Sequence, residues 1–329
     1  MHSITLRLIT TLALAISIGV VACARTVRNL QVTPDQPAAI AELWQEPTSA
    51  STRDLFHGPG GSELLPRQTE FTFVAEDVTG HSPGFDVADD QKIEWSVKTG
   101  PEAQTEVVAS RILWALGFHQ PPTYYIEDWS LKGARTGPQE PGRFRPDLPG
   151  REVVGDWPWH ENPFVGSREF GGLIVANLIL TSWDWKTSNN KIYQLKEPIN
   201  GVHRWFVVRD IGGSLGEFKY PTILKWFRLR GFGQGSRNDL PGFEQQGFIE
   251  RIDADRGRVD FDYRGIYRDV VGTATAPDVR WTCERLSRLT DAQWRDAFRA
   301  GGYTPEQTKR YMDKIKEKVA QGLQLTAAD

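Results

Sequence analysis

The chain has few of the residues from which disulfide frameworks and metal centres are built. Its 329 residues hold two cysteines and six histidines, and the histidines show no metal-ligand spacing. If processing or lipidation takes Cys23, then Cys283 is alone, so no internal disulfide is expected. Cys283 stands in a helix-like stretch, which favours a packed thiol over a nucleophile.

Excess positive charge is also missing. The chain has 39 Lys and Arg against 42 Asp and Glu, a formal net charge of −3, with no basic tail or stripe. This argues against a nucleic-acid partner. No repeat or low-complexity tract is present, and 39% hydrophobic with 11% aromatic residues supports a real core. The length suits one large domain or two modest lobes.

The N-terminus reads as a targeting segment. Arg7 precedes an apolar run, 8–21, that is too short to span a bilayer comfortably. The run ends in Val-Val-Ala-Cys23, which resembles the lipobox of bacterial lipoproteins; ordinary cleavage after Ala24 is the alternative. We predict an exported protein on the periplasmic or cell-surface side. A signal segment, 1–23, would be lipidated at Cys23, and the Pro-bearing stretch 24–50 would be a flexible tether.

The remaining chain predicts an α+β protein of two lobes. Strand patterns at 71–75, 85–87 and 92–98 are followed by a helix over 102–116 and a return strand near 121–126. A Gly-, Pro- and Arg-rich linker or insertion comes next, and then a largely helical part with a hairpin at Asn200-Gly201 and helix starts near Thr290 and Thr304. The predicted units are an N-lobe at 51–135, the linker at 136–166 and a C-lobe at 167–329.

A glycine-bearing turn lies between the first two strands, as Gly80-x-Ser82-x-Gly84. Without bulky side chains, backbone N–H groups can approach phosphate oxygens. Taken alone, the same residues favour a plain hairpin turn. They also match G-x-S-x-G literally, but a nucleophile elbow needs a turn from strand to helix, and this turn joins two strands.

A lysine and a glutamate follow in the strand and helix. Lys98 ends the third strand and Glu106 lies on the helix after it, with Glu102 as a competing partner. A strand lysine held by a helix glutamate can fix an ammonium against nucleotide phosphates. The alternative is a solvated surface pair.

Two polar loops of the C-lobe complete the set. In Asp184-x-Lys186-x-x-Asn189, the aspartate could deprotonate a hydroxyl, the lysine could neutralise a phosphoryl group and the asparagine could ligate a metal. Asn190 makes that ligand ambiguous by one position. Asp210, at a strand end before Ile-Gly, supplies the oxygen that Mg²⁺ prefers. A helix-capping loop and a turn aspartate are the plainer interpretations.

The order of these pieces resembles the protein-kinase-like superfamily. The loop beginning at Asp184 has the D-x-K-x-x-N spacing of kinase catalytic loops, Asp210-Ile-Gly is similar to D-F-G, and Val97-Lys98 stands where V-A-I-K ends. Ser-Trp replaces the His-Arg before the aspartate, and no A-P-E follows. In these departures, and in the helix ending at Gly117 with the Pro-Pro that follows it, the chain resembles the atypical branches of the superfamily. These branches are the HipA-like, secretory-pathway and CotH-type kinases. The resemblance covers roughly 70–215.

The resemblance implies a two-lobed protein-kinase-like fold with a small antiparallel-sheet N-lobe and a mainly helical C-lobe. It implies a Mg²⁺-dependent phosphotransferase that moves a phosphoryl group from ATP or another nucleotide to an unknown hydroxyl acceptor. The alternatives are a binding module of the same fold without turnover, and a surface lipoprotein that uses some of its 12 tryptophans, such as Trp157 and Trp159, for a glycan or a partner.

Overall fold

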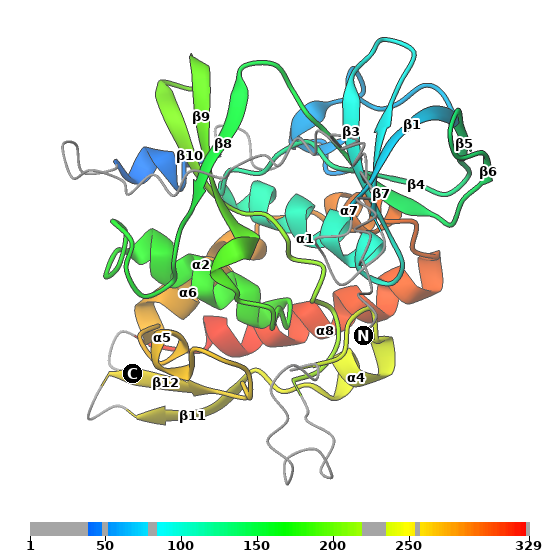
Figure 1. Cartoon of the computed structure of the whole chain (residues 1–329). Helices are drawn as coiled ribbons and strands as arrows, with labels where there is room; N and C mark the ends of the chain where they lie inside the picture. Colours follow the sequence, from blue (N-terminus) through cyan, green and yellow to red (C-terminus); the bar gives the residue numbers. More distant parts are fainter. Residues whose placement is uncertain (1–38, 48–51, 78–83, 219–234, 254–256, 327–329) are drawn as a thin grey trace, which may run out of the picture.

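The computed structural model describes residues 39–47, 52–77, 84–218, 235–253 and 257–326 of the chain. They form a sheet-rich N-lobe, covered on one side by a helix, and a larger lobe of helices with two small sheets (Figure 1). The two-lobed α+β fold class expected from the sequence is therefore confirmed. The predicted site residues Cys23, Gly80 and Ser82 lie outside the described residues.

The N-lobe is built on seven strands in the order β4-β7-β3-β2-β1-β5-β6. Their bounds are β1 Glu70–Asp77, β2 Gly84–Ala88, β3 Glu94–Thr99, β4 Tyr124–Ile126, β5 Ser130–Lys132, β6 Gly137–Pro138 and β7 Gly142–Pro146. The predicted three-stranded meander, β1 to β3, is present with antiparallel pairing. The sheet is not purely antiparallel as expected, because β1 pairs with β5 in parallel.

The segment 136–166, predicted as a linker or insertion, contains real strands. β7 lies between β3 and β4 and pairs with both. Phe144 is fully buried with Phe71 and Trp95 in the core on one side of the sheet, which explains why this Gly- and Pro-flanked stretch is extended. β8 (Arg151–Asp156) pairs with β9 in the second lobe. The boundary between the lobes thus falls after β7, later than residue 135.

Helix α1 (Glu102–Leu116) forms where the sequence predicts it. Gly117 ends the helix with φ 105°, a left-handed conformation that glycine adopts without a Cβ penalty, and its N–H donates to Trp114 O. The helix is buried nearly all round, so it serves as the shared core element of both lobes.

The second lobe contains the remaining elements: α2 Arg168–Ile179, η4 Thr187–Asn189, β9 Asn190–Ile199, β10 Val202–Val208, α4 Leu240–Gln245, β11 Ile249–Asp253, β12 Arg258–Phe261, α5 Arg268–Val271, α6 Ala276–Leu286, α7 Asp291–Ala300 and α8 Pro305–Leu323. The β9–β10 hairpin turns at Asn200 and Gly201, both at positive φ, as predicted. Capping boxes at Thr290 and Thr304 begin α7 and α8 at the predicted positions.

One large apolar core fills this lobe and reaches α1. Trp157 and Trp159 are 1% and 2% exposed, with tilted rings whose centroids lie 5.2 Å apart, so these two tryptophans do not offer a binding surface. Cys283 is buried on α6, and burial raises the pKa of its thiol to about 12, as suits a packed thiol. Among the described residues, no helix has the length and apolar character to cross a membrane.

The predicted tether is shorter than 24–50. Residues 39–47 include the short η1 helix (Ile40–Glu42) and pack on the second lobe. Trp44 lies 5.3 Å from the Trp281 ring and donates to Leu116 O, while Glu42 pairs with Arg204 at 2.9 Å. Apolar burial and an ion pair thus hold this stretch, against the expectation of a flexible one.

Candidate functional site

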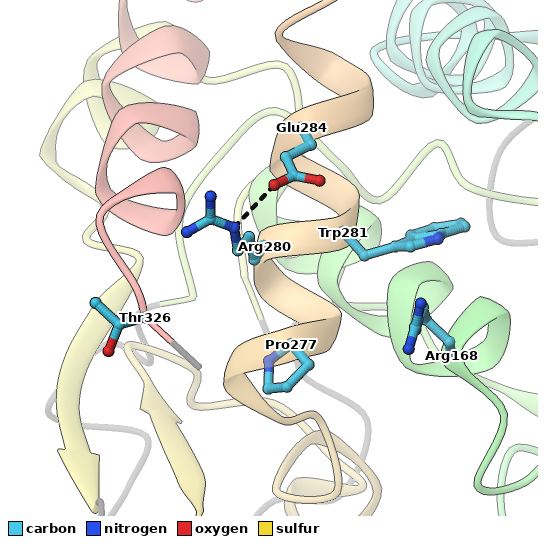
Figure 2. Close-up of a pocket in the computed structure, with 6 residues that line it drawn as sticks. All are labelled: Arg168, Pro277, Arg280, Trp281, Glu284 and Thr326. Carbon is cyan, nitrogen blue, oxygen red and sulfur yellow. Dashed lines mark hydrogen bonds and ion pairs between the residues drawn. The ribbon is translucent and has the colours of Figure 1, made fainter. Parts of the chain in front are cut away.

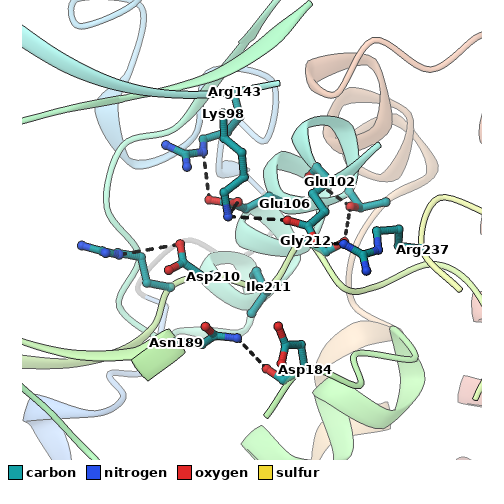
Figure 3. Close-up of polar contacts among 12 residues, drawn as sticks. Lys98, Glu102, Glu106, Arg143, Asp184, Asn189, Asp210, Ile211, Gly212 and Arg237 are labelled. Carbon is teal, nitrogen blue, oxygen red and sulfur yellow. Dashed lines mark hydrogen bonds and ion pairs between the residues drawn. The ribbon is translucent and has the colours of Figure 1, made fainter. Parts of the chain in front are cut away.

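The strand lysine and the helix glutamate meet between β3 and α1 (Figure 3). Lys98 Nζ lies 3.7 Å from Glu106 Oε2 and 3.6 Å from Glu102 Oε2, so both candidate partners hold it. The Glu106 side chain is 1% exposed, which excludes the solvated surface pair considered above. The predicted contact between Lys98 and Glu106 is therefore present.

The loop after α2 places the next three residues. Asn189 Nδ2 donates to the backbone oxygen of Asp184 at 2.7 Å and closes the loop on itself. This bond uses the amide nitrogen and leaves the amide oxygen for another partner. The Lys186 ammonium lies 3.0 Å from Asp184 Oδ2, but its side chain is 62% exposed. Lys186 therefore contacts the aspartate from the solvent side.

Asn190 is distinguished from Asn189 by the structure. The Asn190 side chain is fully buried at the start of β9 and donates to Trp157 O at 3.0 Å. It is part of the packing between β9 and the segment that follows β8. Of the two asparagines, Asn189 is the one that lies beside Asp184 and Asp210.

Asp210 follows β10 and joins the two halves of the site. Its backbone N–H lies 3.3 Å from Asn189 O, which ties it to the loop of Asp184. Two residues later, Gly212 O accepts a 2.6 Å hydrogen bond from Thr105 Oγ1 on α1. A Cβ at Gly212 would lie 2.7 Å from Glu102 Cβ, so glycine permits this approach. Asp184 and Asp210 thus lie in one region with Lys98 (Figure 3).

Four arginines surround these residues, and the sequence analysis named none of them: Arg143, Arg145, Arg209 and Arg237. Arg145 Nη2 contacts Glu106 and lies 3.2 Å from Asp210 Oδ1. Arg237 forms an ion pair with Glu102. The alternation Arg143-Phe144-Arg145 was a usable signal, because a strand presents residues i and i+2 on one side.

The charges around Asp210 govern its protonation. Burial alone would raise its pKa, but Arg209, Arg145, Lys98 and Arg143 together hold the pKa of the Asp210 carboxyl well below its usual range. These cations thus favour the ionised form of Asp210. An ionised oxygen donor is what a hard divalent cation requires.

The residues present fit a magnesium ion shared with phosphate groups. Asp210 and Asn189 offer oxygens, and Mg²⁺ in proteins is commonly bound by one or two carboxylates plus substrate phosphates. No group of three His, Cys, Asp or Glu side chains suited to a metal occurs in the described part of the chain. The site therefore lacks the all-protein cage that would bind the ion alone.

Of the predicted glycines, Gly84 falls within the described residues. It begins β2 directly opposite Lys98 on β3, so the end of the predicted turn lies beside the lysine. A Cβ at Gly84 would lie 3.1 Å from Val97 O and from Asp77 Cβ. The close packing suits a glycine.

A surface hollow lies elsewhere, over α6 and the first turn of α2 (Figure 2). It is lined by Arg168, Pro277, Arg280, Trp281, Glu284 and Thr326. Arg280 and Glu284 form an ion pair one helical turn apart at 2.8 Å. None of the predicted site residues lines this hollow.

Comparisons with known proteins do not assign the chain to a family. No protein-family model matches the chain, and no curated protein matches it. Among solved structures, the chain is similar to the crystal structure of a Helicobacter pylori proinflammatory kinase, CtkA. The identity is 12%, the TM-score is 0.44, and the match covers 77% of this chain and 96% of that one. A likeness of this degree says nothing about activity.

Proposed function

We propose that the chain is an atypical kinase-like phosphotransferase that moves a phosphoryl group from ATP or another nucleotide to a hydroxyl acceptor. The observation that carries the proposal is the convergence of Lys98, paired with buried Glu106, with Asp210, Asn189 and Asp184. These residues come from both lobes. Two carboxylates and a fixed ammonium brought together this way suit the binding of a charged ligand.

Each residue has a role that follows from its chemistry. Lys98, held between two glutamates, would contact the nucleotide phosphates. Asp184 would orient the acceptor hydroxyl and take its proton as the new O–P bond forms and the bond to the leaving phosphate breaks. Lys186, on the solvent side of Asp184, would approach the transferred group. Asp210 and Asn189 would hold Mg²⁺, which neutralises phosphate charge when it is bound.

A kinase-fold module that binds without turnover is the second candidate. The observation in its favour is the ion pair between Asp210 and Arg145, since the carboxylate proposed for the metal already has a cationic partner. The two candidates differ in whether phosphoryl transfer occurs once the nucleotide is bound.

Nucleotide binding and transfer can be measured on the full chain. We expect ATP to bind with Mg²⁺, and a γ-labelled nucleotide to lose its label to water or an added hydroxyl compound. Asp184→Asn should keep ATP affinity and lower the transfer rate by about 10²- to 10⁴-fold, because it removes a proton acceptor and leaves the phosphate contacts. Binding without transfer in the wild type supports the non-catalytic module, and no ATP binding rejects both.

We also propose that the protein is exported and lipidated at Cys23, on the motif Val-Val-Ala-Cys. The wild type should fractionate with membranes, and Cys23→Ala should appear in the soluble fraction. If the variant is processed and fractionates like the wild type, lipidation at Cys23 is wrong, whatever the outcome for nucleotide binding.

A further inference from the structure

Two cations stand directly opposite one another in the N-lobe sheet. In the β3–β7 register Lys98 is the partner of Arg143, and Ser96 is the partner of Arg145. Like charges directly opposite on a pair of strands destabilise it. Glu106 lies 3.7 Å from Lys98 and 3.0 Å from Arg143, and Glu102 lies 3.6 Å from Lys98, but Glu106 is shared with Arg145 and Glu102 with Arg237. The register therefore leaves positive charge at this position.

Arg145 adds to this charge and is buried. Its side chain is 7% exposed, and its Nε atom has no hydrogen-bond partner within the described parts of the chain. Burial, and after it the like charge of Arg145, lowers the pKa of Arg143 to about 10, although Glu106 and Asp210 oppose the shift. Two adjacent, desolvated guanidinium groups are costly unless an anion compensates them.

The whole cluster has more cations than carboxylates. Among the described residues it contains five cations and three carboxylates, a surplus of two, since Asp184 is offset by Lys186. The cations are Lys98, Arg143, Arg145, Arg209 and Arg237, and the carboxylates are Glu102, Glu106 and Asp210.

Three side chains of the cluster are partly exposed to solvent. The side chains of Lys98, Arg209 and Arg237 are 21%, 21% and 23% exposed, whereas those of Arg143 and Arg145 are 2% and 7% exposed. A ligand can thus reach the partly exposed cations, and the charges of the buried arginines add to the attraction. Guanidinium groups suit such a ligand because their donors match phosphate oxygens in pairs.

We propose that Lys98, Arg143, Arg145 and Arg209 form a polyphosphate site that binds a triphosphate chain without a divalent cation. The proposal rests on the proposed function in that the ligand is the triphosphate of the nucleotide, and it adds that the arginines, rather than the metal, supply the first neutralising charge. Inorganic triphosphate has the same chemistry and should bind as well.

Asp210 has a second role under this proposal. Its carboxylate occupies Arg145 and lies 3.8 Å from Arg209 Nε, so it competes with the phosphate oxygens for both guanidinium groups. Removing its charge should therefore strengthen binding of the anion in the absence of metal. A site that depends on metal predicts the opposite, namely loss of binding.

The test is calorimetric titration of the full chain with sodium triphosphate, and separately with ATP, in EDTA. We expect both ligands to bind, with affinities that fall as NaCl is raised. Arg145→Gln and Arg209→Gln should each weaken binding by about tenfold or more, and Asp210→Asn should strengthen it by about tenfold. Arg251→Gln is the matched control, because it removes an exposed arginine paired with Asp260 on the β11–β12 ribbon.

The Asp210→Asn variant distinguishes loss of a ligand contact from misfolding, because only a folded site can bind triphosphate more tightly. The proposal is overturned if inorganic triphosphate does not bind in EDTA while ATP binds with Mg²⁺, and that result leaves the proposed function standing. It is also overturned if triphosphate binding ignores both arginine variants, or if Asp210→Asn abolishes it. If neither triphosphate nor Mg²⁺-ATP binds, the proposed function fails together with it.

Discussion

Asn189 Nδ2 donates a 2.7 Å hydrogen bond to the backbone oxygen of Asp184, so the two polar ends of the D-x-K-x-x-N segment are held together. The bond orients the Asn189 amide with its nitrogen toward Asp184, and the amide oxygen is left for a ligand. Asn190, one residue further, has its amide nitrogen on Trp157 O inside the core. The two neighbouring asparagines therefore have different surroundings, Asn189 beside Asp184 and Asn190 in the core.

This difference is testable with two alanine variants. Asn190→Ala should lower the free energy of unfolding by about 1–3 kcal/mol, because it leaves the buried Trp157 carbonyl without its partner. Asn189→Ala should have a smaller effect on stability and reduce the gain in ATP affinity on adding Mg²⁺. Urea denaturation and calorimetry separate the two. If the two variants lose the same stability and show the same gain in ATP affinity on adding Mg²⁺, the assignment of Asn189 as the metal ligand is contradicted.

The Asp210→Ala variant tests the metal role of the carboxylate. In the wild type, Mg²⁺ should raise ATP affinity, because the ion adds positive charge between Asp210 and the phosphates. In the variant, Mg²⁺ should no longer raise ATP affinity, while metal-free binding of ATP to the arginines persists. The measurement is a pair of ATP titrations, with EDTA and with Mg²⁺. A variant whose affinity still rises on adding Mg²⁺ would remove Asp210 from the metal site.

Local patterns explain which parts of the site were predictable. Lys98 and Glu106 lie on consecutive elements, a strand and the helix after it, so their meeting follows from alternation, a turn and helical spacing. The hairpin at Asn200-Gly201 and the capping boxes at Thr290 and Thr304 are local for the same reason.

The arginines were missed because their position depends on a long-range pairing. β7 pairs with β3 although the two strands are far apart in the sequence, with Lys98 opposite Arg143, and the flanking Gly and Pro of β7 favoured a loop. Only the sheet order brings Arg143 and Arg145 onto Glu106, and only the return of β10 brings Asp210 there. Periodicity describes one element at a time, so it predicts a strand's faces but not its neighbours.

Gly212 provides a test of how the loop after β10 controls α1. A Cβ at this position would meet Glu102 Cβ at 2.7 Å and Glu102 O at 3.1 Å, at the first turn of the helix. Gly212→Ala should therefore displace that turn, lose the Thr105 hydrogen bond and weaken ATP binding, at a cost of about 1–3 kcal/mol in stability.

Gly155→Ala is the control for Gly212→Ala, because a Cβ at Gly155 has no atom within 4 Å outside its chain neighbours. Thermal melts and ATP titrations of both variants give the comparison. If Gly212→Ala binds ATP as the wild type does, the contact between this loop and α1 does not position Lys98.

The last prediction concerns Lys318, a buried lysine on α8. Its Nζ donates to Ile179 O at the end of α2, at 3.1 Å, and lies 4.2 Å from the centre of the Phe243 ring on α4. Burial lowers the pKa of its ammonium to about 7; Lys314 lowers it further, while Glu317 and Asp262 oppose the shift. The Lys318 ammonium thus lies where α8, α2 and α4 meet.

The sign of the effect follows from the two pKa values of Lys318. Between about pH 7 and the ordinary value of 10.5, the unfolded chain binds this proton and the folded chain does not, so stability rises with pH in that window. The slope is at most about 1.4 kcal/mol per pH unit for one proton. Lys318→Met should remove this slope and be more stable than the wild type at pH 6, where the wild type buries a charge. Urea denaturation at pH 6 and pH 9, with the exposed Lys309→Met as control, measures both effects. If the wild type and Lys318→Met gain stability equally between these pH values, Lys318 does not titrate there.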